Sequence, residues 1–344
     1  MLFNIEVDSG ECISGYVVPD TFSGVPAIRI CANGEERCTL TANEMRQALV
    51  GAGRHETGQC GFLIDTQLVP DLPALTDLEL FDAETNVLIY RRPNPTHIKK
   101  KLLRLETHLF PLWALDNAIA SQFQYFGKGV ENLGQETVMQ LFLLNNIESV
   151  YLSGRILYKN FAYFIESGFQ TLVVLQDPYE ELAERLLVLS KIRKVGTTHL
   201  GMRERTTLEP AMDFAESLPM QDEKALRRAL RQMPENVAAL LANPLVRQLT
   251  VGSPDEMPAG SAIASALDIL ANSALVGLRY QPTTFLGGFA ELLVLDPATL
   301  PGLPKFATVA PLAQLLRQCG EVDMLLEKDM EVYHCVQSAF EKAP

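Results

Sequence analysis

Residues 149–185 contain the polar groups that first suggest chemistry. The segment reads SVYLSGRILYKNFAYFIESGFQTLVVLQDPYEELAER, in which a short apolar run ends at Ser153-Gly154-Arg155 and a helix is expected to follow. A helix that begins at the carboxyl end of a parallel strand offers free backbone N–H groups and the positive end of its dipole to an anion. Ser153, Gly154 and Arg155 are therefore predicted to bind an anion, and an ordinary strand-to-helix turn is the alternative.

The best-known signatures of catalytic and nucleotide sites are missing from the sequence. No GxxxxGK[ST] motif is present, and no GxGxxG motif follows a predicted strand. The sequence also has no HExxH, GxSxG or DxD motif. A P-loop nucleotide site of the standard kind is thereby excluded, and zinc peptidase and α/β-hydrolase functions have no support. No metal site is predicted.

One histidine is a candidate for general-base catalysis. His199 lies in the polar segment TTHLGMRERTT, together with Arg203 and Arg205. General-base catalysis requires an imidazole within hydrogen-bond reach of the reacting hydroxyl group. We therefore predict His199 as the base and the two arginines as anion-binding groups. A solvated histidine in a loop is the alternative.

Two clusters of basic residues stand out in an acidic chain. They are Lys99, Lys100, Lys101 and Arg104, and Arg227, Arg228 and Arg231. Each is predicted to form the solvated face of a helix, or else a cradle for an acidic sugar or a phosphate group. The net charge of −13 and the pI of about 4.9 argue against general binding to nucleic acid, because such a field repels polyanions.

The composition indicates a globular protein with two domains. The chain has 344 residues, of which 47% are hydrophobic and 21% charged. No run is long and apolar enough to predict a membrane span, and the first residues do not resemble a signal peptide. The six cysteines form no CxxC pair, so reduced thiols and a cytoplasmic location are expected. The oligomeric state stays open.

The first 92 residues are predicted to form a small β-sandwich. Short apolar or alternating runs recur there between turn signals, and Asn33-Gly34 is the strongest of these signals. Both residues tolerate the positive φ that a type I′ hairpin turn requires. The segment RRPNPT, residues 91–96, contains two prolines and is a plausible linker.

Residues 97–344 are predicted to form an α/β domain with a short parallel sheet and many helices. Apolar residues at three- and four-residue intervals predict helices in residues 97–126 and 131–146. The runs SVYL and TLVVL predict two buried strands, which an intervening helix would join as a parallel pair. Asp177 is expected to cap the next helix, with Pro178 at its first position.

The segment TLVVLQDPYEELAERL resembles the second phosphate-binding segment of the sulfotransferases. ALDILANSALVGLRYQPTTFLGGFAELL and EVDMLLEKDMEVYHCVQSAF are similar to later parts of that fold, so the resemblance covers roughly residues 145–340. It implies a P-loop-like fold and phosphoadenosine phosphosulfate as the donor. The family's phosphate-binding arginine and serine fall on Gln176 and Glu184, which are thus the implied donor-binding positions. An amide and a carboxylate there differ from the family pattern.

Residues 10–90 resemble a small β-sandwich module found beside glycosyltransferase and sulfotransferase domains in bacterial polysaccharide clusters. The shared pattern is an early SGYV, a hairpin, a short helix and GFLID. Together the two resemblances imply a sulfotransferase-like protein that acts on or near a cell-surface polysaccharide or its precursor. The alternative is a catalytically inactive binding or scaffold protein in polysaccharide assembly. An acidic glycan or a nucleotide is the expected partner.

Overall fold

The computed structural model describes residues 1–195 and 199–342. The chain forms two compact units, which are described separately. The first unit comprises residues 1–101, 119–127 and 133–152, and the second comprises residues 102–118, 128–132 and 153–344. The division of the sequence into residues 1–92 and 97–344 stays a prediction.

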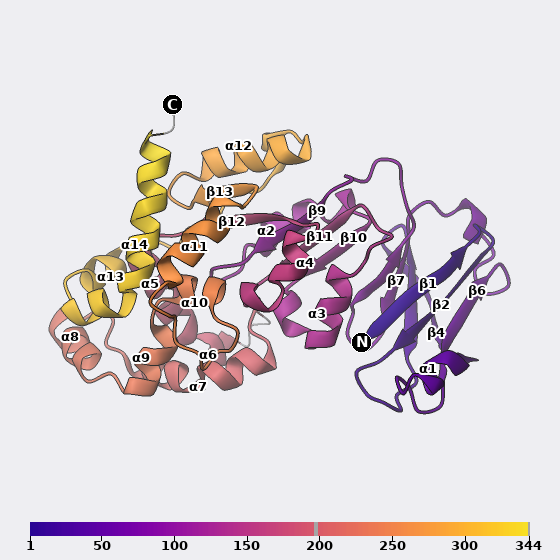
Figure 1. Ribbon diagram of the computed structural model, residues 1–344, viewed down its shortest axis with the longest axis horizontal. Helices are drawn as coiled ribbons and strands as arrows, with labels where there is room; N and C mark the ends of the chain where they lie inside the picture. Colours follow the sequence, from indigo (N-terminus) through magenta and orange to yellow (C-terminus); the bar gives the residue numbers. More distant parts are fainter. Residues whose placement is uncertain (196–198, 343–344) are drawn as a thin grey trace. The chain divides into compact units, whose positions relative to one another are not determined.

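The first unit contains two four-stranded antiparallel sheets (Figure 1). One has the order β1 (Leu2–Asp8), β2 (Cys12–Val18), β6 (Gln59–Asp65) and β5 (Glu44–Met45). The other has the order β4 (Glu35–Thr41), β3 (Ala27–Ala32), β7 (Leu78–Asp82) and β8 (Leu88–Arg91). Buried and half-buried residues alternate along β2 and β7, as expected for strands with one face on a core.

The hairpin predicted at Asn33-Gly34 is confirmed. The two residues have φ angles of 54° and 78° and join the antiparallel strands β3 and β4. The helical elements of this unit are short: α1 (Gln47–Gly51), η1 (Leu72–Ala74), η2 (Ala120–Gln122) and α3 (Gln135–Phe142).

A five-stranded parallel sheet confirms the predicted α/β class. Its order is β10 (Tyr125–Lys128), β11 (Val150–Gly154), β9 (Lys101–Leu105), β12 (Gln170–Leu175) and β13 (Leu275–Leu278). β12 pairs in parallel with β9 on one side and with β13 on the other. The predicted strands at SVYL and TLVVL are present as β11 and β12, but they do not form a pair, because β9 lies between them.

The central strand β9 corrects the sequence prediction of a helix over residues 97–126. Leu102, Leu103, Arg104 and Leu105 are all buried. A strand in the middle of a parallel sheet is covered on both faces and therefore shows no alternation of polar and apolar residues. A five-residue run of this kind cannot be told from a helical segment by periodicity.

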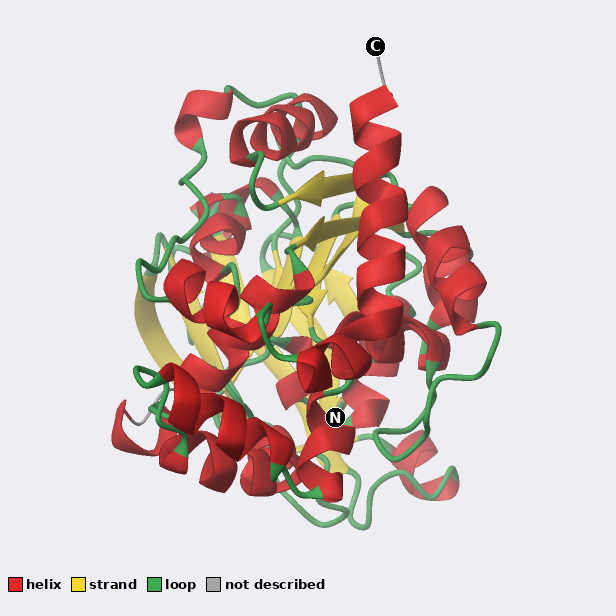
Figure 2. Ribbon diagram, turned by 90° about the vertical axis from the view of Figure 1, so that its left-hand side faces the viewer, coloured by secondary structure: helices red, strands yellow, loops and turns green. Residues whose placement is uncertain are grey.

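Helices make up most of the second unit, and Figure 2 shows them in front of the strands. In chain order they are α2 (Trp113–Ala118), η3 (Val130–Asn132), η4 (Tyr158–Asn160), α4 (Ala162–Glu166), α5 (Pro178–Leu189), α6 (Ile192–Val195), α7 (Met202–Ser217), α8 (Glu223–Arg231), α9 (Glu235–Leu241), α10 (Pro244–Thr250), α11 (Ala262–Ala271), α12 (Pro282–Leu293), η5 (Pro297–Thr299), α13 (Val309–Leu316) and α14 (Gly320–Lys342). Among the described residues, no helix is long and apolar enough to cross a membrane.

Helix α5 begins as the sequence predicts. The Asp177 side chain accepts hydrogen bonds from the backbone N–H groups of Tyr179 and Glu180, and Pro178 occupies the first helical turn. Leu182, Ala183, Leu186 and Leu189 join the main apolar core of the unit. This core fixes α5 directly after β12, so that its first turns lie at the carboxyl end of the sheet.

Reciprocal polar contacts join α10 to the middle of α14. The Oδ1 atom of Asn243 accepts hydrogen bonds from the backbone N–H groups of Lys328 and Asp329, at 2.9 and 3.1 Å. In return, the buried Asp329 carboxylate accepts from the N–H groups of Leu245 and Val246, at 2.9 and 2.8 Å. Asn243 takes a left-handed conformation with φ of 44°, which asparagine tolerates better than most residues.

Candidate functional site

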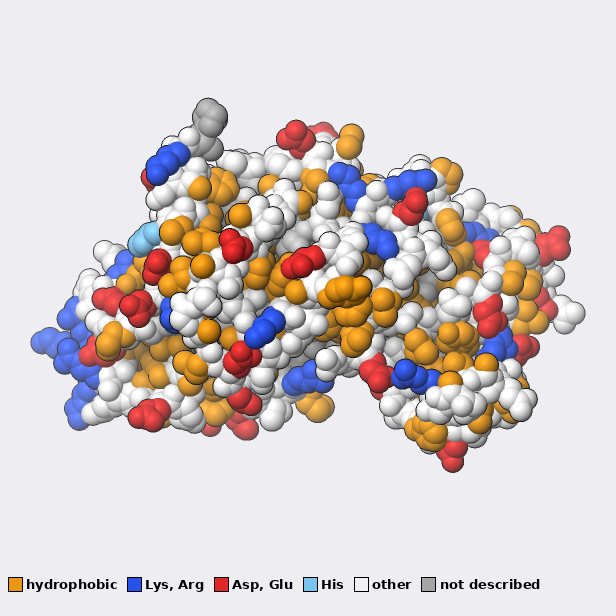
Figure 3. Space-filling model, viewed as in Figure 1, with side chains coloured by type: hydrophobic (Ala, Val, Ile, Leu, Met, Phe, Trp, Pro, Cys, Tyr) orange, Lys and Arg blue, Asp and Glu red, His pale blue; other side chains and the backbone are white. Residues whose placement is uncertain are grey.

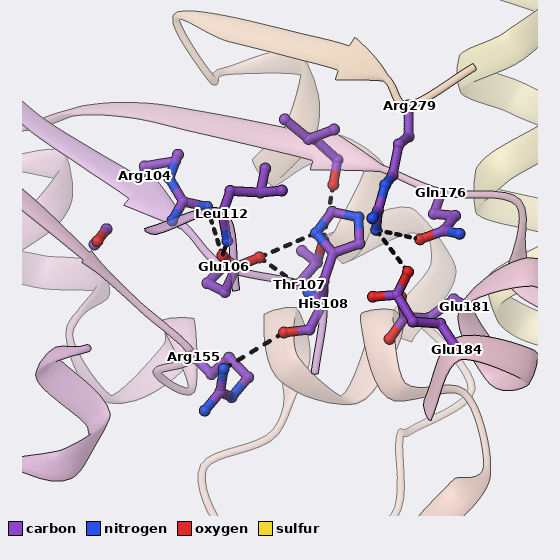
Figure 4. Close-up of polar contacts among 12 residues, drawn as sticks. Arg104, Glu106, Thr107, His108, Leu112, Arg155, Gln176, Glu181, Glu184 and Arg279 are labelled. Carbon is purple, nitrogen blue, oxygen red and sulfur yellow. Dashed lines mark hydrogen bonds and ion pairs between the residues drawn. The ribbon is translucent and has the colours of Figure 1, made fainter. Parts of the chain in front are cut away.

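Polar residues follow directly after four neighbouring strands of the parallel sheet. Glu106 comes after β9, Arg155 after β11, Gln176 after β12 and Arg279 after β13 (Figure 4). Ligands of open α/β sheets bind at the carboxyl ends of the strands. The candidate site is therefore the polar network that these residues form.

The Arg104 guanidinium holds the network together at the central strand. Its side chain is 1% exposed. It donates to both carboxylate oxygens of Asp116 at 2.7 Å, and its Nη1 donates to Glu106 Oε2 at 2.9 Å. Ser153 Oγ donates to Asp116 Oδ2 at 2.8 Å. A bidentate pair of this kind fixes both side chains and neutralises charge that burial would otherwise make costly.

The Glu106 carboxylate accepts hydrogen bonds from backbone N–H groups of the loop between β9 and α2. Oε1 accepts from the N–H of His108 at 3.1 Å, and Oε2 accepts from the N–H of Leu112 at 2.7 Å. Burial raises the pKa of Glu106, but the Arg104 charge and these hydrogen bonds outweigh burial, so the pKa lies below its usual value. The chain thus places its own anion where the loop presents hydrogen-bond donors.

His108 is the one imidazole of the network, and Glu106 orients it. Its Nδ1 lies 3.0 Å from Glu106 Oε1, and the neighbouring Thr107 hydroxyl donates to Val174 O at 2.7 Å. The His108 Nε2 atom is buried and has no hydrogen-bond partner within the described part of the chain. If Nδ1 carries the proton that bonds Glu106, Nε2 presents a lone pair, which is the arrangement of an oriented general base.

Arg279 brings together the two positions that the sequence marks for donor binding. Its Nη1 donates to Gln176 Oε1 at 2.6 Å and lies 3.1 Å from Glu184 Oε2 (Figure 4). Burial, and then the neighbouring Glu181 carboxylate, raise the pKa of Glu184. Arg279 therefore contacts both Gln176 and Glu184, and their role in donor binding stays a prediction.

Arg155 is enclosed by carboxylates. Its Nε and Nη2 donate to the two oxygens of Glu204 at 2.8 and 2.7 Å, and Nη2 lies 2.9 Å from Glu131 Oε1. Burial lowers the pKa of Arg155, but the Glu204 and Glu131 carboxylates outweigh it and raise the pKa above its usual value. Two carboxylates thus already neutralise the guanidinium that was expected to bind an anion.

The helix expected to follow Ser153-Gly154-Arg155 is present as α4, but it begins only at Ala162, and Ser153 and Gly154 still belong to β11. Gly154 instead permits the close approach of Glu131: a Cβ atom at this position would lie 2.4 Å from Glu131 Oε2. The Arg155 backbone N–H donates to the same oxygen at 3.0 Å. The anion-binding role of Ser153, Gly154 and Arg155 stays a prediction.

His199 lies apart from the sheet residues but touches the network through its backbone, since Arg155 Nη2 donates to its carbonyl at 2.6 Å. Its ring packs edge-on against Phe110 and Trp113, with centroids 5.0 and 5.1 Å away. Burial, and then the Arg155 charge, lower its pKa.

The other predicted anion-binding groups are not part of the network. Arg203 lies on the exposed face of α7, and Arg205 donates from Nε to the carbonyl of Leu200 at 2.9 Å. Their roles, and that of His199 as a base, stay predictions.

The two predicted basic clusters differ in the exposure of their side chains. In the first, Lys99 is exposed, whereas Arg104 is buried in β9. The second lies on α8, where Figure 3 shows Lys and Arg side chains gathered at the left end of the molecule. Arg227 pairs with Glu223 and Arg231 with Glu321. This helix therefore shows the solvated charged face that the sequence predicted as one of two alternatives.

Carboxylates outnumber guanidinium groups in the carboxyl-end network. The guanidinium groups belong to Arg104, Arg155 and Arg279, and the carboxylates to Glu106, Asp116, Glu131, Glu184 and Glu204. No group of three or more His, Cys, Asp and Glu residues that could hold a metal ion occurs in the described ranges. Burial raises the pKa of two of these carboxyl groups, Glu131 and Glu184.

Sequence reasoning missed Glu106, His108 and Arg279. For Glu106 and Arg279 the available signal was a charged residue that directly follows an apolar run, in KLLRLE and ALVGLR. This signal could not be used for Glu106, because the strand before it was predicted as a helix.

No protein-family model matches the chain, and no curated protein shows significant similarity to it.

Proposed function

We propose that this protein is a sulfotransferase-like protein whose donor site is closed by its own side chains, and that it serves as a non-catalytic binding or scaffold protein in polysaccharide assembly. The α/β fold with a parallel sheet supports the first part of the proposal, together with the sulfotransferase-like segments at residues 145–340. The polysaccharide setting rests on the resemblance of residues 10–90 to a module of polysaccharide clusters.

The position of the Glu106 carboxylate carries the proposal. An anionic donor that used the N–H groups of His108 and Leu112 would have to displace this carboxylate from both hydrogen bonds and from Arg104. Breaking a buried ion pair costs about 3–5 kcal/mol, because one charge is left uncompensated. That cost is comparable to the whole binding energy of a millimolar ligand, about 4 kcal/mol.

The second donor position, at Gln176 and Glu184, also supports a closed donor site. Glu184 places a carboxylate where a phosphate group would have to bind, and Gln176 supplies an amide that already accepts from Arg279. Like charges in a buried site repel each other, and burial and the Glu181 carboxylate already raise the pKa of Glu184.

A second candidate function is an active transferase that acts on a glycan. The oriented His108 favours it, because Glu106 fixes Nδ1 and the buried Nε2 has no partner within the described residues. In that case His108 would accept the proton of an acceptor hydroxyl group.

A thermal-shift measurement with adenosine bisphosphate separates the two functions. A ligand at about 100 times its dissociation constant adds about 2.7 kcal/mol to the stability of the native state, which corresponds to several degrees in Tm. We expect no change in Tm at millimolar nucleotide. A shift of several degrees, together with sulfate transfer to a glycan that His108→Ala abolishes, would overturn the proposal in favour of the active enzyme.

A further inference from the structure

A cavity of about 190 Å³ lies beside the polar network in the second unit. Helices α5 and α6, the loop after β9 and the segment before α13 form its walls. The lining side chains are Phe110, Glu184, Leu187, Val188, Lys191, Ile192, Val195, His199, Phe306, Thr308 and Val309. Phe306 and Val195 are 37% and 66% exposed, so the cavity has an apolar entrance from solvent.

The size and lining of the cavity suit one apolar ring. A dry cavity of about 150 Å³ lined by Leu, Ile and Phe is large enough for benzene. Phe110 and Phe306 meet edge to face, with centroids 4.9 Å apart, and present aromatic surface to the cavity together with His199. A sugar ring or a phosphate group would lose its hydration here without gaining enough hydrogen bonds in return.

Glu184 belongs both to the cavity wall and to the network. Its Oε2 pairs with Arg279, while Oε1 has no hydrogen-bond partner within the described residues. The side chain is 2% exposed, and Glu181 lies near enough to raise its pKa further. This end of the cavity therefore presents a buried carboxylate oxygen that no described residue contacts by a hydrogen bond.

A second polar atom without a partner belongs to the same wall. His199 Nδ1 is buried, and no described residue donates to it or accepts from it. Burial and the Arg155 charge lower the pKa of His199, so the imidazole is neutral near pH 7 and retains a lone pair. Carboxylate and imidazole acceptors beside aromatic rings are groups that stabilise a cation.

We propose that the cavity binds a small ligand with one apolar ring and one positive charge, with the ring between Phe110, Phe306 and α5 and the cationic group directed to Glu184. The cationic group donates to the Glu184 oxygen that has no partner within the described residues. The cavity shares Glu184 with the second donor position, but the proposal does not depend on the scaffold function. The amine preference and nucleotide binding are measured separately, so either proposal can fail without the other.

Three probes of nearly equal shape test the charge preference in the full chain. They are 4-fluorobenzylamine, which is cationic at neutral pH, 4-fluorotoluene, which is neutral, and 4-fluorobenzoate, which is anionic. We expect ¹⁹F NMR titrations to show saturable binding of the amine about tenfold tighter than of the toluene, with no binding of the benzoate. Equal or weaker binding of the amine would overturn the proposal.

Two variants test whether the preference for the amine arises in this cavity. Glu184→Gln keeps the shape of the side chain and should remove the preference for the amine while the toluene still binds. Val188→Phe fills the cavity and should weaken both ligands at least tenfold. Val7→Phe, at an exposed valine of β1, is the matched control and should change neither.

A further variant covers the case in which Val188→Phe lowers Tm. Thr308→Trp narrows the entrance at an exposed position and should weaken the amine to the same degree. Unchanged amine binding in both cavity variants, or a retained amine preference in Glu184→Gln, would show that the ligand binds elsewhere and would refute the assignment.

Discussion

Two fully buried carboxylates accept the same number of backbone hydrogen bonds but have opposite pKa shifts. Glu106 accepts from the N–H groups of His108 and Leu112, and Asp329 accepts from those of Leu245 and Val246. The pKa of Glu106 lies below its usual value, whereas burial raises that of Asp329 to about 7. Burial and backbone donors are common to both sites, so they cannot explain the difference.

The difference lies in the neighbouring cation. Glu106 forms an ion pair with Arg104 at 2.9 Å. Among the described residues Asp329 has no ion pair of this kind, and the Arg185 charge, which lowers its pKa, is opposed by the Glu181 carboxylate. Two backbone hydrogen bonds therefore hold a carboxylate in place but do not keep it charged in the protein interior, and a paired guanidinium does.

The largest expected effect comes from removing that guanidinium. Arg104→Met should destabilise the protein by about 3–5 kcal/mol, because Glu106 and Asp116 are left buried without their counter-charge. Urea denaturation monitored by circular dichroism measures the loss. Lys99→Met, at an exposed position of the same basic run, is the control and should change stability by less than about 0.5 kcal/mol. A loss below about 1 kcal/mol in Arg104→Met would contradict the comparison.

Substitution of Asn243, which joins α10 to α14, should have the next largest effect on stability. Asn243→Ala leaves the backbone N–H groups of Lys328 and Asp329 without their acceptor and places alanine at a positive φ. We expect a loss of about 2–4 kcal/mol, since each unsatisfied buried group costs about 1–3 kcal/mol. Asn243→Gly, which tolerates this φ, should lose less. If the two variants were equally stable, backbone strain would play no part in the loss.

The pH dependence of stability should distinguish the contribution of Asp329 from that of Glu106. The pKa of Asp329 rises from 3.8 to about 7 on folding, so the native state binds more protons between these values. Its contribution to stability is present below pH 4 and is lost as the pH rises to about 7, with a slope of up to about 1.4 kcal/mol per pH unit. Asp329→Asn should flatten this part of the wild-type profile.

Glu106 should behave in the opposite way, because its pKa is lowered on folding. Its contribution is present above the usual glutamate pKa and is lost as the pH falls below about 4. Denaturation midpoints measured at several pH values in the wild type and in Asp329→Asn test both statements. An unchanged slope between pH 4 and 7 in the variant would mean that Asp329 does not titrate there.

The sequence allowed prediction of elements whose signals are local. The turn at Asn33-Gly34 and the cap at Asp177 depend on backbone preferences of one or two residues, and β12 on a short apolar run. The strand β9 was missed because burial on both faces removes the alternation that marks a strand. Arg104 consequently appeared to belong to an exposed helical face.

Prediction of the candidate site required knowledge of contacts that no local sequence pattern reveals. Gln176 and Glu184 were identified as donor positions, but Arg279, the cation that contacts both, directly follows β13, about a hundred residues later in the sequence. Arg155 was identified, whereas its partners Glu131 and Glu204 come from a 3-10 turn and from α7. Ion pairs of this kind follow from the packing of distant segments, which periodicity does not reveal.

The most direct measurement is a calorimetric titration of the full chain with adenosine bisphosphate at neutral pH and low salt, where electrostatic attraction is strongest. Because we propose that the Glu106 and Glu184 carboxylates close the donor site, we expect no saturable heat of binding up to about 1 mM nucleotide. A dissociation constant below about 100 µM would contradict the proposal that this protein closes its donor site with its own carboxylates.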